Sequence, residues 1–170
     1  MFFKIKAKYN FDNVLENCFK SVSEVCEKSE FQYIDKNIMK IEISENEKFE
    51  FKDFYYVKNQ VPLFSQYLMD KIKIFDDVDN LFLKEVSLCY DGEKERYFIA
   101  VPSRIRCFDY ENSVFEKSGN LYRVKKAVIS SENVGRYIIF KAYGVEDDNI
   151  YVSKRLANVL KCDDVIVENI

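Results

Sequence analysis

The chain contains no histidine, four glycines and two prolines among its 170 residues. Because histidine is the commonest general base, its absence excludes Ser-His and Cys-His nucleophile systems. It also removes a usual ligand of zinc sites. The glycine-rich loops that cradle nucleotide phosphates are missing as well. We therefore expect neither a metal site nor a cofactor.

The five cysteines stand at positions 18, 26, 89, 107 and 162, and no two form a Cys-x-x-Cys pair. An odd number without close pairs predicts reduced, half-buried thiols. The N-terminus lacks the apolar run of a signal peptide. No stretch approaches the roughly 20 apolar residues that a membrane helix needs. These features predict a cytoplasmic protein with no membrane partner.

Apolar residues make up 48% of the chain and charged residues 32%, which is typical of a globular protein. The 15 phenylalanines and 12 tyrosines favour strands. A chain of this length can bury about two-thirds of its unfolded surface without disulfides or metals. We predict a single domain over residues 1–170, with a candidate N-terminal annex of strand, helix and strand at residues 1–50.

Hydrophobic periodicity predicts the elements. Phe3, Ile5 and Ala7 alternate with lysines, which indicates a strand, and spacings of three and four over residues 11–28 indicate a helix. Residues 81–143 read as consecutive strands with hairpin turns at 91–92 and 117–120. We predict an α+β fold with a mostly antiparallel central sheet flanked by a few short helices.

Two stretches share one order of residues. Residues 61–73 and 150–161 each hold apolar residues, a serine, spaced apolar residues and a lysine, and Asp-Asp-Val follows each. This pattern predicts a strand–Ser–helix–strand unit that occurs twice. Ser65 and Ser153 stand where a hydroxyl can cap the helix start. Without histidine or glycine nearby, capping explains both serines better than nucleophilic catalysis.

Charge leaves two further classes of function open. The net charge of −3 disfavours a general nucleic-acid binder, because phosphate affinity comes from clustered Lys and Arg. A nucleic-acid-associated regulatory protein remains the first alternative, with bases stacked on aromatic side chains. Its candidate cations are Arg104, Arg106, Lys125 and Lys126.

The second alternative is a small hydrolase with paired carboxylates, for which Asp109/Glu111 and Asp163/Asp164 are candidates. The acidic stretch Asp76–Asn80 lacks the glycine and the terminal glutamate of a calcium loop. We interpret it as a solvated turn.

The segment 96–115 begins a series of motifs that resembles a known family. An apolar-Asp-x-x-x-Ser-x-apolar motif spans Asp109 to Ser113, and Tyr137-Ile138-Ile139-Phe140-Lys141 and the Ser153 helix follow. Together these resemble the MXAN-type immunity-protein family of bacterial polymorphic toxin systems, formerly a domain of unknown function. The resemblance covers residues 55–170. The final strand departs from the family pattern, with Asp164-Val165-Ile166-Val167 in place of Gly-apolar-x-Phe.

The resemblance implies a non-enzymatic antitoxin that binds and neutralises a cognate toxin in the cytoplasm, with no catalytic residues. An acidic inhibitor can be steered to a basic toxin by electrostatic attraction. The sequence sets no oligomeric state. We expect partner contacts at two acidic turns, which comprise Asp76, Asp77 and Asp79 in one and Glu146, Asp147 and Asp148 in the other.

Overall fold

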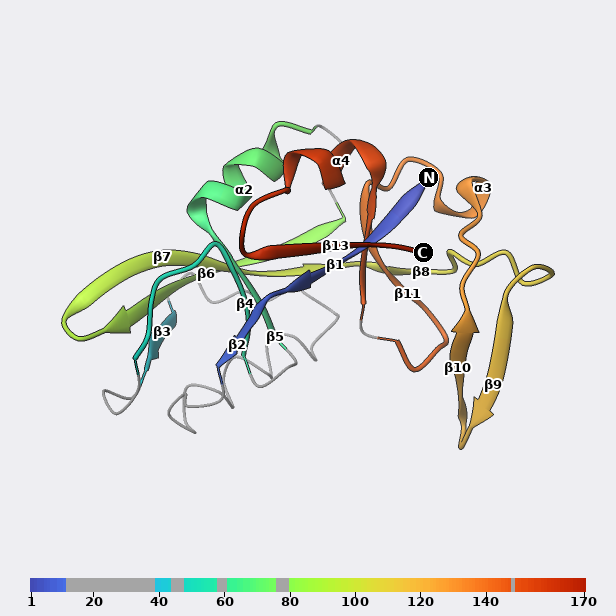
Figure 1. The fold of residues 1–170 in the computed structure, drawn as a ribbon, viewed down its shortest axis with the longest axis horizontal. Helices are drawn as coiled ribbons and strands as arrows, with labels where there is room; N and C mark the ends of the chain where they lie inside the picture. Colours follow the sequence, from blue (N-terminus) through green and yellow to red (C-terminus); the bar gives the residue numbers. More distant parts are fainter. Residues whose placement is uncertain (12–38, 44–47, 58–60, 76–79, 148) are drawn as a thin grey trace. The chain divides into compact units, whose positions relative to one another are not determined.

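The structure is a computed structural model that describes residues 1–11, 39–43, 48–57, 61–75, 80–147 and 149–170 (Figure 1). The helix expected over residues 11–28 falls almost wholly outside them. Contacts divide the chain into two compact units, each taken by itself below. Unit 1 comprises Met1–Lys6, Ile72–Leu81 and Pro102–Ile170, and unit 2 comprises Ala7–Lys71 and Phe82–Val101. The single domain and the annex stay predictions.

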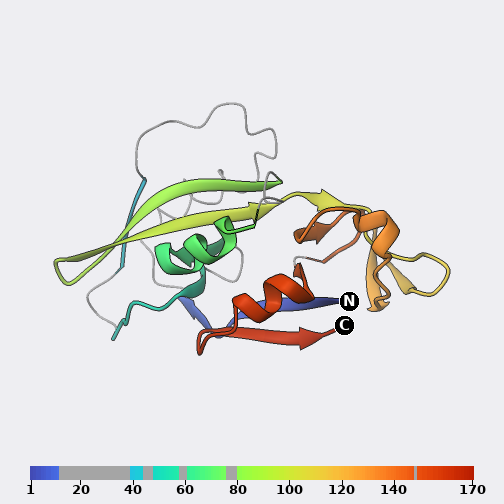
Figure 2. The ribbon, with the colours of Figure 1, turned by 90° about the horizontal axis from the view of Figure 1, so that it is seen from above.

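Unit 2 is built around a six-stranded sheet with the order β2-β4-β5-β7-β6-β3. Helix α2 (Gln66–Lys73) lies over this sheet (Figures 1 and 2). The strands are β2 (Tyr9–Phe11), β3 (Met39–Glu42), β4 (Phe54–Val57), β5 (Val61–Ser65), β6 (Leu81–Tyr90) and β7 (Glu93–Pro102).

Side chains of this sheet alternate between two apolar faces, as period-two patterning requires. One face contributes Tyr55, Leu63 and Ile99 to a buried cluster. The opposite face holds a cross-strand aromatic row, in which Phe64 pairs with Phe54 on β4 and with Phe98 on β7. The Phe54 and Phe64 rings stack at 4.4 Å between centroids. Burial on both faces explains why β5 reads as a continuous apolar run.

Unit 1 contains a five-stranded sheet with the order β13-β1-β12-β11-β8, and a separate two-stranded hairpin. The sheet strands are β1 (Phe2–Ala7), β8 (Arg104–Ile105), β11 (Ile139–Ala142), β12 (Ile150–Ser153) and β13 (Val165–Asn169). The hairpin strands are β9 (Val114–Ser118) and β10 (Leu121–Lys126), and the helices are α3 (Ser131–Val134) and α4 (Lys154–Val159).

Aromatic rings organise the core of unit 1. Tyr151 on β12 is fully buried and stacks on Phe140 of β11 at 5.7 Å between centroids. Phe108 meets Tyr151 edge-on at 6.2 Å. Offset-stacked and edge-on geometries are the favourable ones for aromatic pairs. These rings sit in one buried cluster with Cys107 and Val134.

Serine side chains cap the helices. The Ser65 hydroxyl oxygen accepts from the Leu68 amide at 3.2 Å, and that of Ser153 accepts from the Leu156 amide at 3.3 Å. Each bond satisfies one of the unpaired N–H groups of a helix start. Ser65 also donates to the Asp53 carboxylate at 2.6 Å. A third serine, Ser130, caps α3, a helix that the sequence did not predict.

The expected α+β class is present, but the expectation of one mostly antiparallel central sheet is wrong. The strands form two separate mixed sheets and a hairpin. Parallel pairs join β2 to β4, β3 to β6 and β8 to β11. Parallel neighbours need long connections, which the chain supplies between each of these pairs. Hydrophobic periodicity is a local signal, so it predicts strands and hairpins but not the pairing of strands that are far apart in the sequence.

Candidate interaction site

Of the six acidic residues predicted to contact a partner, the structure describes Glu146 and Asp147. The other four, Asp76, Asp77, Asp79 and Asp148, lie outside the described residues. Glu146 is exposed and Asp147 is half-buried in the loop between β11 and β12. Both are engaged within unit 1, in different ways.

The Asp147 carboxylate is directed at the start of β12. It accepts from the phenol of Tyr151, from the Asn149 backbone N–H at 2.7 Å and from the Asn149 side-chain amide. Its backbone carbonyl accepts from Arg104 at 3.1 Å. Burial and the nearby Asp147 carboxylate raise the pKa of Tyr151. Asp147 thus satisfies the one polar atom of a buried tyrosine ring.

Cys107 lies in the same cluster and is fully buried. Burial is the main cause that raises its pKa to about 12, and Asp147 adds to it. Because the thiolate is the reactive form, this thiol is a poor nucleophile at neutral pH. Cys89 and Cys162 are half-buried thiols outside any disulfide, as the cysteine spacing predicted.

Glu146 joins the same loop to the hairpin. Its backbone N–H donates to the Tyr122 carbonyl at 2.8 Å. Its carboxylate lies 3.3 Å from the Arg123 guanidinium. The neighbouring Val145 forms a parallel bridge with Tyr122. The loop therefore connects the core of unit 1, through Asp147, to strand β10, through Glu146.

The Asp109–Ser113 motif holds the turn that leads into the hairpin. Asp109 accepts from the backbone N–H groups of Glu111 and Asn112 at 3.0 and 3.1 Å. The Asn112 side-chain amide also donates to it, and these bonds lower the Asp109 pKa. The Ser113 hydroxyl donates to the Val128 carbonyl and accepts from its N–H. Asp109 and Ser113, the two polar positions that define the motif, thus serve local structure.

The β9–β10 register sorts the hairpin side chains into two faces. Phe115 stands opposite Val124, and Lys117 stands opposite Tyr122. We call the face formed by these four residues the inner face, because Phe115 and Val124 pack against the core cluster. Glu116 and Arg123 stand opposite each other on the other face, which we call the outer face.

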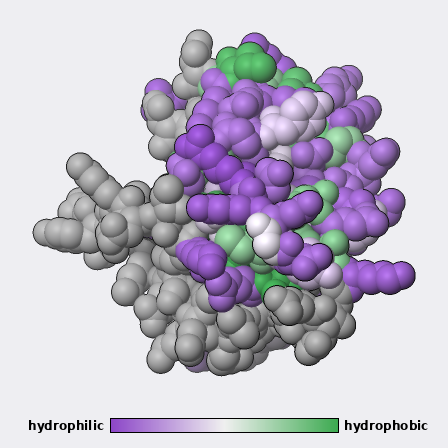
Figure 3. Space-filling model, turned by 90° about the vertical axis from the view of Figure 1, so that its left-hand side faces the viewer, coloured by the Kyte–Doolittle hydropathy of each residue, from purple (hydrophilic) through white to green (hydrophobic). Residues whose placement is uncertain are grey.

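Large hydrophobic side chains are exposed around this hairpin. Of the ten exposed ones among the described residues, five lie between positions 110 and 143, at Tyr110, Val114, Leu121, Tyr122 and Tyr143. Single exposed apolar residues are normal, but a local group of them is a feature of interaction surfaces. By contrast, Figure 3 views the β6–β7 end of unit 2, where hydrophilic residues dominate the coloured surface.

Sequence reasoning missed this group because it assigned strand aromatics to the core. The available signal was local: Leu121 and Tyr122 follow the Gly119 turn directly and precede a run of basic residues. A two-stranded ribbon cannot bury both of its faces by itself, so side chains near its turn stay exposed.

Three of the four cations proposed for nucleic-acid binding are engaged within unit 1. Arg104 donates to the carbonyls of Ala142 and Asp147. Arg106 lies over the Tyr143 ring at 5.8 Å, and Lys125 pairs with Glu116 at 2.7 Å. Lys126 is exposed.

Within the part of the chain that the structure describes, no three His, Cys, Asp or Glu side chains group as metal ligands would. No helix there is both long and apolar enough to span a bilayer. No model of a known protein family matches the chain, and no curated protein matches it.

Proposed function

We propose that this chain is a non-enzymatic immunity protein that binds and neutralises a cognate bacterial toxin in the cytoplasm of the producing cell. The observation that supports it best is the group of exposed tyrosine and aliphatic side chains on and beside the β9–β10 hairpin. Tyrosine is enriched among residues that dominate protein–protein binding energy. The resemblance of residues 55–170 to MXAN-type immunity proteins supplies the class of partner.

The local structure of the motifs suits this role. Asp109, Ser113 and Ser153 hold turns and helix starts, which leaves them no evident part in chemistry. We propose that the strand–Ser–helix–strand pattern serves as framework at both of its occurrences. Function would then reside in the surface that the framework presents, as expected of an inhibitor that acts by covering its target.

Co-expression with the protein encoded by the adjacent upstream gene tests the proposal. We expect that protein to arrest growth when expressed alone and to be tolerated when this chain is co-expressed. A purified mixture should elute as one complex in size-exclusion chromatography. Growth arrest that persists despite equal amounts of this chain would refute the proposal.

A further inference from the structure

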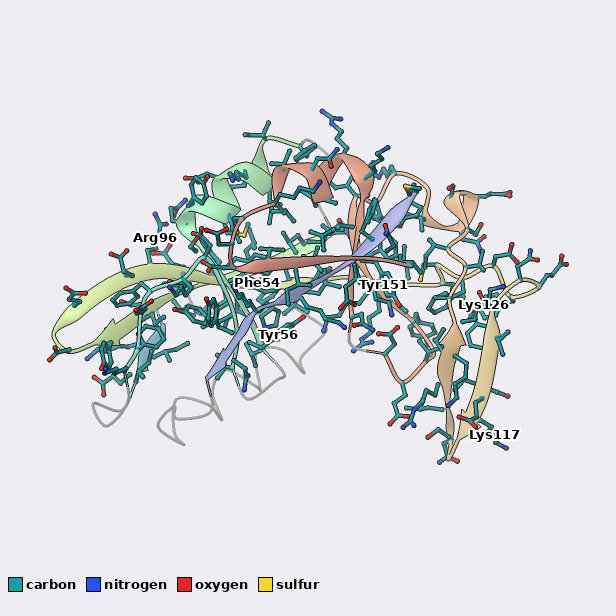
Figure 4. The ribbon with its side chains drawn as sticks, viewed as in Figure 1. Phe54, Tyr56, Arg96, Lys117, Lys126 and Tyr151 are labelled. Atoms are coloured by element: carbon teal, nitrogen blue, oxygen red, sulfur yellow. The ribbon has the colours of Figure 1, made fainter. Side chains whose placement is uncertain are left out.

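We infer that the contact surface for the toxin is formed by Tyr110, Lys117 and Tyr122 (the hairpin patch), and that the toxin meets it with an acidic surface. The inference rests on the proposed function and deepens it, because it names the docking surface and the chemistry of the partner's contact. Figure 4 shows Lys117 at the turn end of the hairpin and Lys126 at its base.

The three side chains lie along one face. Lys117 and Tyr122 are cross-strand neighbours on the inner face, two positions along from Phe115 and Val124. The Tyr110 ring stacks on Phe115 at 5.5 Å between centroids, with 27° between the ring planes. Phe115 in turn meets the buried Phe108 edge-on at 5.6 Å. One aromatic row therefore leads from the core to the exposed Tyr110, and Lys117 follows Phe115 two positions along the same face.

Each member of the patch is open to solvent. Tyr110 is 56% exposed and Tyr122 is 51% exposed, and Lys117 is exposed too. Within the described residues, no hydrogen bond engages either tyrosine hydroxyl and no carboxylate pairs with Lys117. Tyrosine offers a large amphipathic contact with few rotatable bonds to immobilise, so it suits a protein interface.

Two members of the patch are held by unit 1 before any partner arrives. Tyr110 is fixed by its stack on Phe115, and the backbone of Tyr122 is tied to the 145–147 loop. The Arg123–Glu146 ion pair adds a second tie to that loop. Side chains that are already ordered lose less entropy on association, which strengthens binding. In this surface, Glu146 and Asp147 contribute to partner binding indirectly, by orienting the hairpin.

Charge identifies the chemistry of the partner. Residues 114–126 hold four basic residues and one acidic residue, in a chain whose net charge is −3. Arg123 and Lys125 already pair with carboxylates, which leaves Lys117 and Lys126 to attract an external anion. A carboxylate-bearing protein surface with room for two tyrosine rings complements this arrangement.

The same charges disfavour nucleic acid as the occupant. Phosphate binding draws on several free cations together, and its affinity grows with the number of phosphates neutralised. Here two of the four hairpin cations are neutralised internally, and the carboxylates of Glu116 and Glu146 lie beside them. Exposed aliphatic side chains such as Leu121 and Val114 fit a protein interface instead.

The test measures binding of full-length variants to the purified upstream-gene protein by isothermal titration calorimetry. Tyr122→Ala and Lys117→Glu should each raise Kd about tenfold or more, as truncated interface anchors do. Lys117→Arg should stay close to wild type. Tyr67→Ala on α2, at a tyrosine exposed to a similar extent, and Lys161→Glu, at an exposed lysine outside the hairpin, are matched controls, expected to change Kd by less than about threefold. Thermal melting checks that every variant is folded.

The outcomes separate the two proposals. If the wild type neither binds nor protects, the proposed function fails and the inference fails with it. If the wild type binds and the Tyr122 and Lys117 variants bind equally well, only the inference is overturned. Tight binding of a fluorescent single-stranded 20-mer that Tyr122→Ala abolishes would assign the patch to nucleic acid. A wild-type dimer that the same variant dissociates would assign it to a second copy. Either result overturns the inference.

Discussion

Two tyrosines of unit 1 lie in opposite environments, although each stands in a strand directly after an aliphatic residue. Tyr151 on β12 is fully buried, stacks on Phe140 and donates its hydroxyl to Asp147. Tyr122 on β10 is 51% exposed, and among the described residues its hydroxyl has no hydrogen-bond partner. The first contributes to stability, and we propose that the second contributes to recognition.

The difference arises from what stands opposite each strand. β12 lies between β1 and β11 in a five-stranded sheet, so its side chains are enclosed. Among the residues that the structure describes, β10 has a full partner only in β9, and beyond it a single bridge to Val145. A ring at the turn end of such a ribbon has little to pack against. The tyrosine type is thus shared, and the number of neighbouring strands decides its role.

The largest expected effect is a loss of stability on truncating the buried tyrosine, Tyr151. Tyr151→Ala should lower the free energy of unfolding by about 3–5 kcal/mol, because it empties a large space in a packed core. Tyr122→Ala should change it by less than about 0.5 kcal/mol, as is usual for exposed positions. Urea unfolding followed by circular dichroism measures both. Equal losses for the two variants would show that the hairpin ring is also structural.

A milder change isolates the Tyr151 hydroxyl. Tyr151→Phe keeps the ring and removes the donor to Asp147, so we expect a loss of about 1–3 kcal/mol from the half-buried carboxylate left with fewer partners. Tyr122→Phe is the matched control and should leave unfolding unchanged. A urea unfolding midpoint for Tyr151→Phe equal to that of the wild type would mean that water replaces the phenol as a hydrogen-bond donor to Asp147.

Helix caps provide the next smaller effect. Ser153→Ala should cost about 0.5–2 kcal/mol, because the Leu156 N–H loses its acceptor. Ser65→Ala should cost more within that range, since Ser65 also donates to Asp53. Threonine at either position should recover most of the loss. Toxin binding should persist in both folded alanine variants, and its loss without destabilisation would place function in the repeated pattern.

The turn of the hairpin tests its rigidity. Gly119 has a φ of +60° with open space around its Cα, so strain and not crowding limits its replacement. Gly119→Ala should cost about 1 kcal/mol, and Gly119→Asn less, because asparagine tolerates this region. If the patch depends on a fixed hairpin, Gly119→Ala should also weaken toxin binding more than Gly119→Asn. Equal toxin affinities for the two variants would show that binding does not depend on the conformation of the turn.

The smallest effect is a pH dependence from Asp109. Its pKa is lowered below the usual 3.8 by the bonds from Asn112 and Glu111. A group with a depressed folded-state pKa contributes stability above its unfolded pKa, and this contribution is lost as pH falls through the folded value. Asp109→Asn should therefore flatten the acid limb of the stability curve below about pH 4. An unchanged slope would contradict the assigned bonds.

Local elements were largely predictable. Alternation correctly indicated β1, and the 91–92 and 117–120 turns join β6 to β7 and β9 to β10 as expected. Positive φ at Gly92 and Gly119 fits those turns. The strand expected over residues 137–143 is β11, although it is shorter. The parallel pairs and the division into two sheets were not predictable, because each partner lies far away along the chain.

By itself, the sequence determined the features that depend on a few adjacent residues: strand alternation, serine caps, glycine turns and the absence of histidine-based chemistry. The tertiary structure alone decided which strands lie side by side, that Asp147 meets Tyr151, and that Tyr110 and Tyr122 remain exposed. The physical reason is that periodicity sets which face a side chain points to. What covers that face depends on chain segments brought together only by folding.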